Sequence, residues 1–144
     1  MSRAPLNARR RQRGVTQMEL MIVVVIVGIL ASVGYPAYRE HSLRAARSEG
    51  RGALLAAASR QEQFFLDNKS YADDLADLGM PADTEHDKYQ VAVDAETADC
   101  PIESCYALTA TPVGRQVDDT VCGNLTLNSN GTKGASGDDP AACW

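Results

Sequence analysis

The hydrophobic and polar pattern divides the chain into a basic start, an uncharged apolar run and a longer polar remainder. From Leu20 to Tyr38 there is no charged side chain, and apolar residues occupy every side of a helix, as in a membrane span. After Arg39 the apolar residues recur at three- and four-residue steps, with arginines on the other faces. The pattern therefore predicts one long helix from Val15 to about Leu66, whose second half packs on a globular domain.

A polar connector and short alternating segments follow the predicted helix. The connector is residues 67–88, and the strands lie within residues 89–144. Alternation predicts strands at residues 89–93, 106–111 and 125–127, and a short last strand at Thr132-Lys133 after the hairpin-turn sequence Asn130-Gly131. Strands this close in sequence pair antiparallel, so we predict an α+β fold in which a long N-terminal helix packs on a small antiparallel sheet of three or four strands.

An isolated carboxylate stands at the head of the apolar run. The residues before the run are polar and arginine-rich and end at Gly14, and Glu19 follows five residues later. An ionisable group near the centre of a bilayer costs on the order of 3 kcal/mol and usually marks function. The helix dipole favours an acid at a helix start, but it does not explain an acid followed by a long uncharged span. The pattern predicts a processing site at Gly14 and a functional carboxylate at Glu19. A secretory signal would instead be cut after the apolar core, near Ala31-Ser32-Val33.

These features resemble the type IV pilins, most closely the minor pilins of the PilE type. In that family a peptidase cuts a short basic leader after a Gly and methylates the new N-terminus, and a Glu stands fifth in the mature chain. The resemblance implies a leader at residues 1–14, cleavage between Gly14 and Val15, and N-methylation of Val15. It also implies that Glu19 acts in subunit assembly, by pairing with the N-terminal amine of a neighbouring subunit. Val15 replaces the usual Phe, and Gln17 replaces the usual Leu.

Gly28 and Pro36 interrupt the apolar span. Glycine weakens a helix and proline removes one backbone hydrogen bond, so one expectation is a gentle kink. The resemblance implies another, namely that the segment between such residues loses helical order in assembled pili. It also implies that residues 15–38 form the membrane-spanning and filament-core half of the helix, and residues 39–66 its amphipathic half.

Four cysteines, Cys100, Cys105, Cys122 and Cys143, lie in the last third of the chain. An even number in an exported domain indicates disulfides, and four cysteines allow three pairings. We favour Cys100–Cys105, which closes a tight loop containing Pro101, and Cys122–Cys143, which ties the tail back to a strand. The alternative is a four-thiolate zinc site, for which the spacing of the first two and the isolation of the later two are poor. We expect no metal and no cofactor.

Charge is divided between the basic leader and an acidic remainder. The chain has 14 basic and 19 acidic residues. Removal of the leader takes five arginines and leaves 14 − 5 = 9 basic residues against 19 acidic, a net charge of −10. Basic residues stay on the cytoplasmic side, so we expect the C-terminus to face outward. The resemblance implies one pass through the bacterial inner membrane with a periplasmic C-terminus before assembly, and an extracellular pilus afterwards. Because phosphate contacts need Lys and Arg, the acidic domain argues against a nucleic-acid partner.

The sequence predicts a structural subunit and not an enzyme, since no Ser, Cys, His and carboxylate set has catalytic spacing. The resemblance implies a minor pilin that acts in pilus assembly and in pilus-dependent motility or adhesion. Its expected partners are other pilin subunits, the prepilin peptidase and the inner membrane. The alternatives are a major pilin, a type II secretion pseudopilin, or a pilus-borne DNA-uptake receptor. A receptor needs an exposed basic stripe, and beyond the long helix the domain has only Lys69, Lys88, Arg115 and Lys133.

Overall fold

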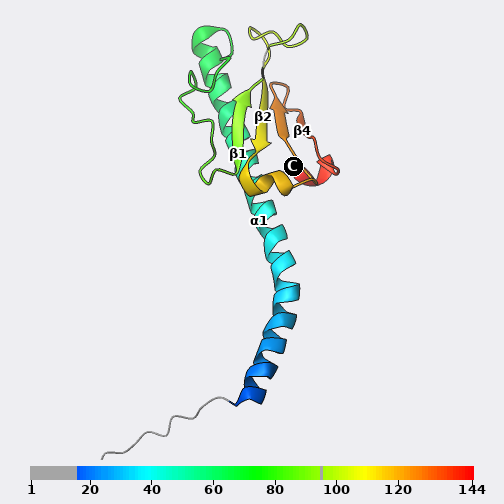
Figure 1. Ribbon diagram of the computed structural model, residues 1–144. Coiled ribbons are helices and arrows are strands. Elements are labelled where there is room, and N and C mark those ends of the chain that lie inside the picture. The colour runs from blue at the N-terminus through cyan, green and yellow to red at the C-terminus, as the bar shows by residue number, and fades with distance from the viewer. Residues whose placement is uncertain (1–15, 95) are drawn as a thin grey trace, which may run out of the picture. The chain divides into compact units, whose positions relative to one another are not determined.

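The structure is a computed structural model that describes residues 16–94 and 96–144, so the expectations for Gly14 and Val15 lie outside it. The chain forms two compact units, Met1–Tyr38 and Arg39–Trp144, and helix α1 (Gln17–Asn68) runs through both (Figure 1). The remaining elements, in chain order, are β1 (Tyr89–Val93), β2 (Ala107–Pro112), the 3₁₀ helix η1 (Gly114–Asp118), β3 (Leu125–Asn128), β4 (Lys133–Ala135) and the 3₁₀ helix η2 (Pro140–Cys143).

The first unit contains the exposed, apolar part of α1. Thr16 caps the helix: its side-chain Oγ1 accepts a hydrogen bond from the Glu19 amide at 3.2 Å, and its carbonyl accepts one from Leu20 at 3.1 Å. By length and composition α1 is able to cross a membrane. It is continuous through Gly28 and Pro36, so the loss of helical order stays a prediction for the assembled filament.

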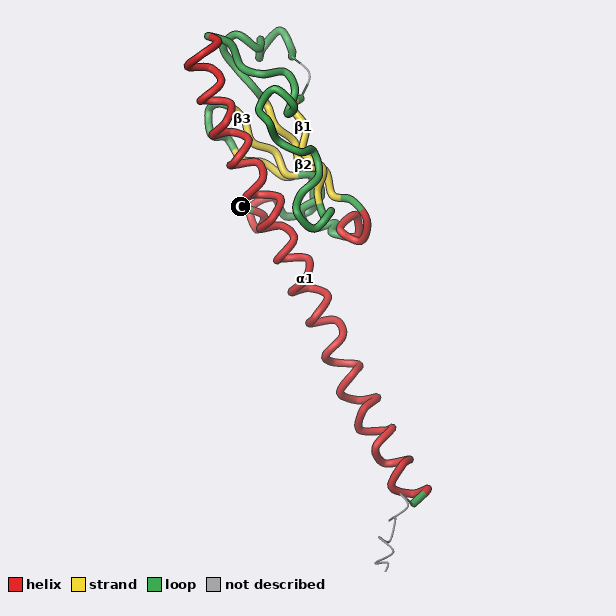
Figure 2. Tube along the Cα trace, turned by 90° about the vertical axis from the view of Figure 1, so that its left-hand side faces the viewer, coloured by secondary structure: helices red, strands yellow, loops and turns green. Residues whose placement is uncertain are grey.

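The second unit contains a four-stranded sheet in the order β1-β2-β3-β4. Every neighbouring pair is antiparallel, as in the pairings of Val91 with Ala110 and of Thr126 with both Thr109 and Gly134. Figure 2 shows the second half of α1 running along one face of this sheet. The predicted α+β fold is therefore confirmed, with four strands.

The core lies between the sheet and one stripe of α1. The buried residues of this stripe are Ala46, Gly50, Leu54, Ala57 and Gln61. The sheet presents Tyr89, Val91, Leu108, Ala110, Leu125 and Leu127 to it. A Cβ on Gly50 would lie 3.0 Å from the ring of Tyr89, so only glycine lets the helix approach the ring this closely.

The predicted hairpin turn is present, but the strand after it begins one residue later than predicted. Gly131 has a φ of 75°, a conformation that favours glycine. The amide of Thr132 donates to Asn128 Oδ1 at 2.9 Å, and this bond keeps Thr132 in the turn. The strand therefore starts at Lys133 and ends at Ala135.

Candidate functional site

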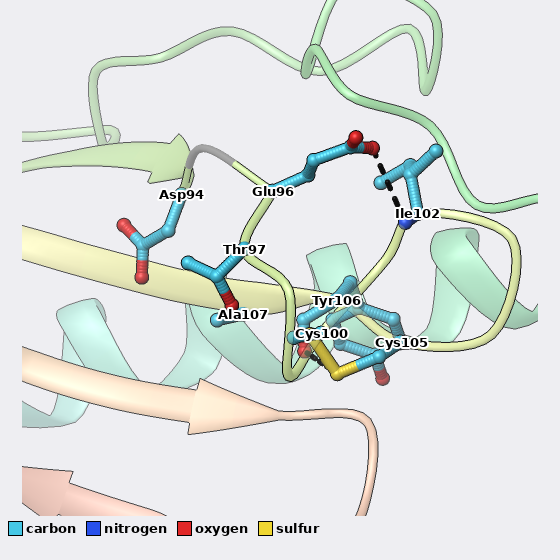
Figure 3. A pocket seen from close by; sticks show the side chains of 8 residues that line it. All are labelled: Asp94, Glu96, Thr97, Cys100, Ile102, Cys105, Tyr106 and Ala107. Carbon is cyan, nitrogen blue, oxygen red and sulfur yellow. Dashed lines mark hydrogen bonds between the residues drawn. A yellow bond between two sulfur atoms is a disulfide. The ribbon is translucent and has the colours of Figure 1, made fainter.

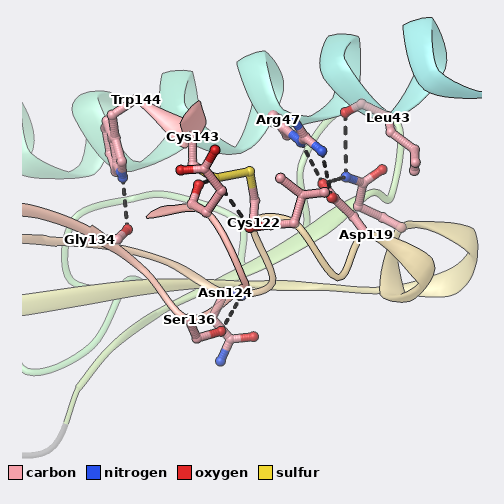
Figure 4. Close-up of a disulfide and its surroundings, with 12 residues drawn as sticks. Leu43, Arg47, Asp119, Cys122, Asn124, Gly134, Ser136, Cys143 and Trp144 are labelled. Carbon is pink, nitrogen blue, oxygen red and sulfur yellow. Dashed lines mark hydrogen bonds and ion pairs between the residues drawn. A yellow bond between two sulfur atoms is a disulfide. The ribbon is translucent and has the colours of Figure 1, made fainter. Parts of the chain in front are cut away.

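The Cys122–Cys143 disulfide ties the tail of the chain to the segment just before β3 (Figure 4). Both cysteines are buried, with exposed fractions of 0% and 1%. Backbone hydrogen bonds add to the disulfide, since Gly137 donates to the carbonyl of Cys122 at 2.9 Å and Asp139 donates to that of Val121 at 3.0 Å. The pairing is the one that the sequence analysis favours, and it fixes the position of the C-terminal residue.

That residue, Trp144, supports the edge of β4. Its indole Nε1 donates to the carbonyl of Gly134 at 2.8 Å, and Lys133 Nζ lies 5.2 Å from the centre of its ring, within the range of a cation–π contact. Next to Lys133, Thr132 and Asn130 are exposed. We call residues 128–133 the hairpin tip. It presents one cation and several uncharged hydrogen-bonding groups.

A buried ion pair joins α1 to the segment after η1. Arg47 Nε and one of its terminal nitrogens each lie 2.6 Å from an oxygen of Asp119, and the side chains are 11% and 0% exposed. Gln116 donates to Asp119 Oδ2 at 3.0 Å and lies 3.1 Å from the hydroxyl of Tyr89. Hydrogen bonding to Asp119 raises the pKa of Arg47. Sequence reasoning missed this pair, because its members are 72 residues apart and Asp119 lies in a polar segment without periodicity.

The loop between β1 and β2 is acidic and closed by the Cys100–Cys105 disulfide (Figure 3). The sequence of residues 94–105 contains four acidic residues and no Lys or Arg. A cavity of about 200 Å³ lies against the disulfide and is lined by Asp94, Glu96, Thr97, Cys100, Ile102, Cys105, Tyr106 and Ala107. Burial raises the pKa of Tyr106 to about 12, so this hydroxyl stays neutral. A polyanion would be repelled by the charges of this loop.

The connector is tethered to α1 by side chains of the helix. Gln61 donates to the carbonyl of Ala72 and accepts from its amide, both at 2.8 Å. Glu49 accepts a hydrogen bond from the amide of His86 at 2.9 Å, and its other oxygen lies 3.1 Å from His86 Nδ1. Burial opposes ionisation of Glu49, but hydrogen bonds from Thr84 and His86 outweigh it and lower the pKa. His86 therefore has a structural contact, and it belongs to no catalytic set in the described part of the chain.

The cations of the second unit divide by whether a carboxylate neutralises them. Ion pairs join Arg39 to Asp118, Arg44 to Glu40 and Arg47 to Asp119. Among the described residues, the cations without a carboxylate partner are Arg51, Arg60, Lys69, Lys88, Arg115 and Lys133. Two of these cations donate hydrogen bonds to backbone carbonyls instead. Arg60 donates to the carbonyl of Leu78, and Lys69 donates to the carbonyl of Leu66. Within residues 16–94 and 96–144, Lys133 is the one cation of this group that lies over an aromatic ring.

The assembly residues expected from the sequence lie in the first unit. Glu19 is exposed on the first turn of α1, and Gly14 and Val15 fall outside the described residues. Its role in subunit assembly stays a prediction. Within residues 16–94 and 96–144, no three His, Cys, Asp or Glu side chains are grouped so as to hold a metal ion.

Two protein families match the chain. The family described as "Type IV minor pilin ComP, DNA uptake sequence receptor" matches residues 36–126, and the "Prokaryotic N-terminal methylation motif" matches residues 9–35. The second match agrees with a membrane-anchored prepilin that later enters a pilus.

The chain is also similar to known pilins and to solved pilin structures. The type IV major pilin protein PilA of Myxococcus xanthus is 34% identical over 104 residues, which are 72% of this chain and 47% of PilA. A fimbrial protein of Neisseria meningitidis is 31% identical over 116 residues, 78% of this chain and 62% of that protein. The chain thus spans about half to three fifths of these relatives. A type IV pilin structure from Shewanella oneidensis matches with a TM-score of 0.51 and 25% identity, over 71% of this chain and 97% of that one.

The expectation that the chain has no nucleic-acid partner is wrong, because the family that matches its domain is described as a receptor for DNA uptake sequences. The expectation used net charge. DNA, however, is held by particular Lys, Arg and hydrogen-bonding side chains at one surface, and an acidic total does not exclude such a surface. The matches also favour the DNA-uptake alternative over an interpretation in terms of motility or adhesion alone.

Proposed function

We propose that the chain, which belongs to the type IV pilin family and within it to the ComP minor pilins, is a receptor that binds DNA uptake sequences on a pilus. The observation that carries the proposal is the family match over residues 36–126. The matched region contains the second half of α1, the connector, β1, β2 and the start of β3. Pilins are structural proteins, so the function is one of binding and assembly and not of catalysis.

The receptor reaches the outside of the cell by entering a filament, and we assign that step to the first unit. In this proposal the leader is removed between Gly14 and Val15, and Glu19 then pairs with the N-terminal amine of a neighbouring subunit. Burying the carboxylate in an apolar filament core without such a partner would be costly. The pairing removes that cost and selects the register in which subunits enter.

Glu19→Val should block incorporation of the subunit while leaving its processing intact. The substitution removes the only acid of the apolar run and leaves the Gly14–Val15 bond unchanged. We expect the intact mass of the membrane-bound variant to show loss of residues 1–14 plus one methyl group, and sheared pili to contain none of it. Incorporation at the level of the parent protein would contradict the pairing role. A mature start near Ala31 would contradict the leader itself.

Charge limits how this domain can hold DNA. Residues 39–144 contain all nine basic residues that follow the leader. They also contain 19 − 1 = 18 of the acids, since only Glu19 lies before them, so their formal net charge is 9 − 18 = −9. Non-specific binding to DNA is almost wholly electrostatic, so the domain should bind arbitrary DNA poorly. Affinity must then come from a small surface that contacts base edges, which is what a receptor for one sequence requires.

The hairpin tip is the surface whose chemistry suits this task. A two-stranded ribbon fits the major groove, where amide and hydroxyl side chains such as those of Asn130 and Thr132 can bond base edges. Lys133, held over the ring of Trp144, supplies a phosphate contact. No acidic residue lies between Asp119 and Asp138 in the sequence, in contrast to the acidic loop between β1 and β2. The tip lies just after the matched residues 36–126.

Lys133→Glu should lower the affinity of the full chain for DNA of its own bacterium by about tenfold, since it replaces a phosphate contact by a repulsive charge. The matched control is Arg115→Glu, which makes the same charge change on η1. The helix η1 follows the end of β2 at Pro112. The hairpin tip lies at the other end of β2, where Ala107 pairs with Asn128. Fluorescence anisotropy at fixed salt measures both variants, and unchanged melting temperatures establish that they are folded. Equal losses in the two variants would place DNA elsewhere than on the tip.

A further inference from the structure

We infer that the exposed side of η1 rests on the phospholipid headgroups of the membrane that anchors the chain before the subunit enters a pilus. The inference depends on the chain being a membrane-anchored prepilin, and it is independent of the proposed DNA binding. It concerns the second unit alone, together with the point at which the chain leaves the apolar run.

The length of the apolar run sets the depth of Arg39. At about 1.5 Å per residue, the run from Leu20 to Tyr38 is about 28 Å long, close to the roughly 30 Å thickness of the hydrocarbon core. Tyr35 and Tyr38 stand at its end, where aromatic residues favour the membrane interface. Arg39 then lies in the headgroup layer, which extends several ångströms beyond the hydrocarbon.

An ion pair brings η1 to the same depth. Arg39 lies 2.6 Å from Asp118, the last residue of η1. This contact lies within the second unit, whose first residue, Arg39, directly follows the apolar run. Gln116 holds η1 in place one turn later on α1, with its amide nitrogen 3.4 Å from the carbonyl of Leu43.

The outer side of η1 carries the side chains that suit a lipid surface. Val117 is 61% exposed, and Arg115 is exposed and has no carboxylate partner within the described residues. Gln116 between them is buried. The two nearest acids are neutralised, Asp118 by Arg39 and Asp119 by Arg47. An apolar side chain can enter the boundary between headgroups and acyl chains, while an adjacent arginine binds lipid phosphate.

The test places a tryptophan on this surface in the full chain. Val117→Trp is reconstituted in vesicles of phosphatidylethanolamine and phosphatidylglycerol that contain lipids brominated near the headgroup. The matched control is Leu66→Trp, a 69% exposed position on the last turns of α1, roughly 40 Å beyond Arg39 along the helix. Both variants keep Trp144, so its emission is a common background.

We expect brominated lipid to quench Val117→Trp about twofold more than Leu66→Trp, because only the former reaches the headgroup layer. Adding Arg115→Glu to Val117→Trp should reduce that difference, and more so in vesicles rich in phosphatidylglycerol. Melting temperatures equal to that of the parent protein verify that the domain is folded. Equal quenching of the two tryptophan positions would overturn the inference.

Discussion

Asp119→Ala should destabilise the domain by about 3–5 kcal/mol, the usual cost of leaving one member of a buried ion pair without its partner. Asp119 is fully buried and the side chain of Arg47 is only 11% exposed, so the remaining guanidinium would have little water to replace its lost partner. The amide of Gln116 would lose an acceptor as well. Urea unfolding of residues 39–144, with both disulfides intact, measures the difference.

The neighbouring residue provides the control. Asp118 pairs with Arg39 at the same 2.6 Å, but the two side chains are 53% and 60% exposed, so Asp118→Ala should cost at most about 1 kcal/mol. The double variant Arg47→Met with Asp119→Leu should recover most of the loss, because apolar residues of similar size replace a buried pair at little cost. A loss for Asp119→Ala no greater than that for Asp118→Ala would show that the buried pair does not hold the domain together.

Removal of the tail disulfide should cost more than removal of the loop disulfide. Cys122 and Cys143 are 21 residues apart in sequence, and Cys100 and Cys105 only 5. In the chain-entropy model the longer loop contributes about 3 kcal/mol and the shorter about 2 kcal/mol. Replacing Cys122 and Cys143 by alanine also leaves a gap in the core, because both are buried, and frees the segment that carries Trp144.

Thermal unfolding of the two double-alanine variants decides the ranking of the disulfides. The tail variant should melt at the lower temperature. Its affinity for DNA should also fall, because Trp144 would no longer hold Lys133 in place. The loop variant should keep both properties close to those of the parent. Equal melting temperatures would mean that the hydrogen bonds from Gly137 and Asp139 already hold the tail without the disulfide.

The sequence predicted those parts of the fold that depend on local periodicity. Local patterns predicted three elements: the long helix, the strand at residues 89–93 and the Asn130-Gly131 turn. Each has a repeat or a turn signal of its own. The ion pair of Arg47 with Asp119 and the position of η1 were not predicted. They depend on contacts between residues distant in sequence, and single polar residues give no sign of their partners.

The candidate site shows the same limit in another form. The two cysteine pairs were apparent from the residues, and the processing site and the role of Glu19 stay predictions. The DNA partner was missed. Net charge averages the acidic loop of residues 94–105 with the acid-free hairpin tip, and only the fold shows that Lys133 lies on Trp144 at one edge of the sheet. A single chain also contains no record of the DNA sequence that it would recognise.

The most direct measurement of the central claim is a selection from genomic DNA. Sheared DNA of the source bacterium is incubated with the full chain at physiological salt, and the retained fragments are sequenced before and after competition with unrelated DNA. A receptor for an uptake sequence should enrich one short motif and retain it under competition, and the Lys133→Glu variant should retain about tenfold less of it. Retention of fragments without a shared motif, or no retention above that of the buffer control, would contradict the proposed function.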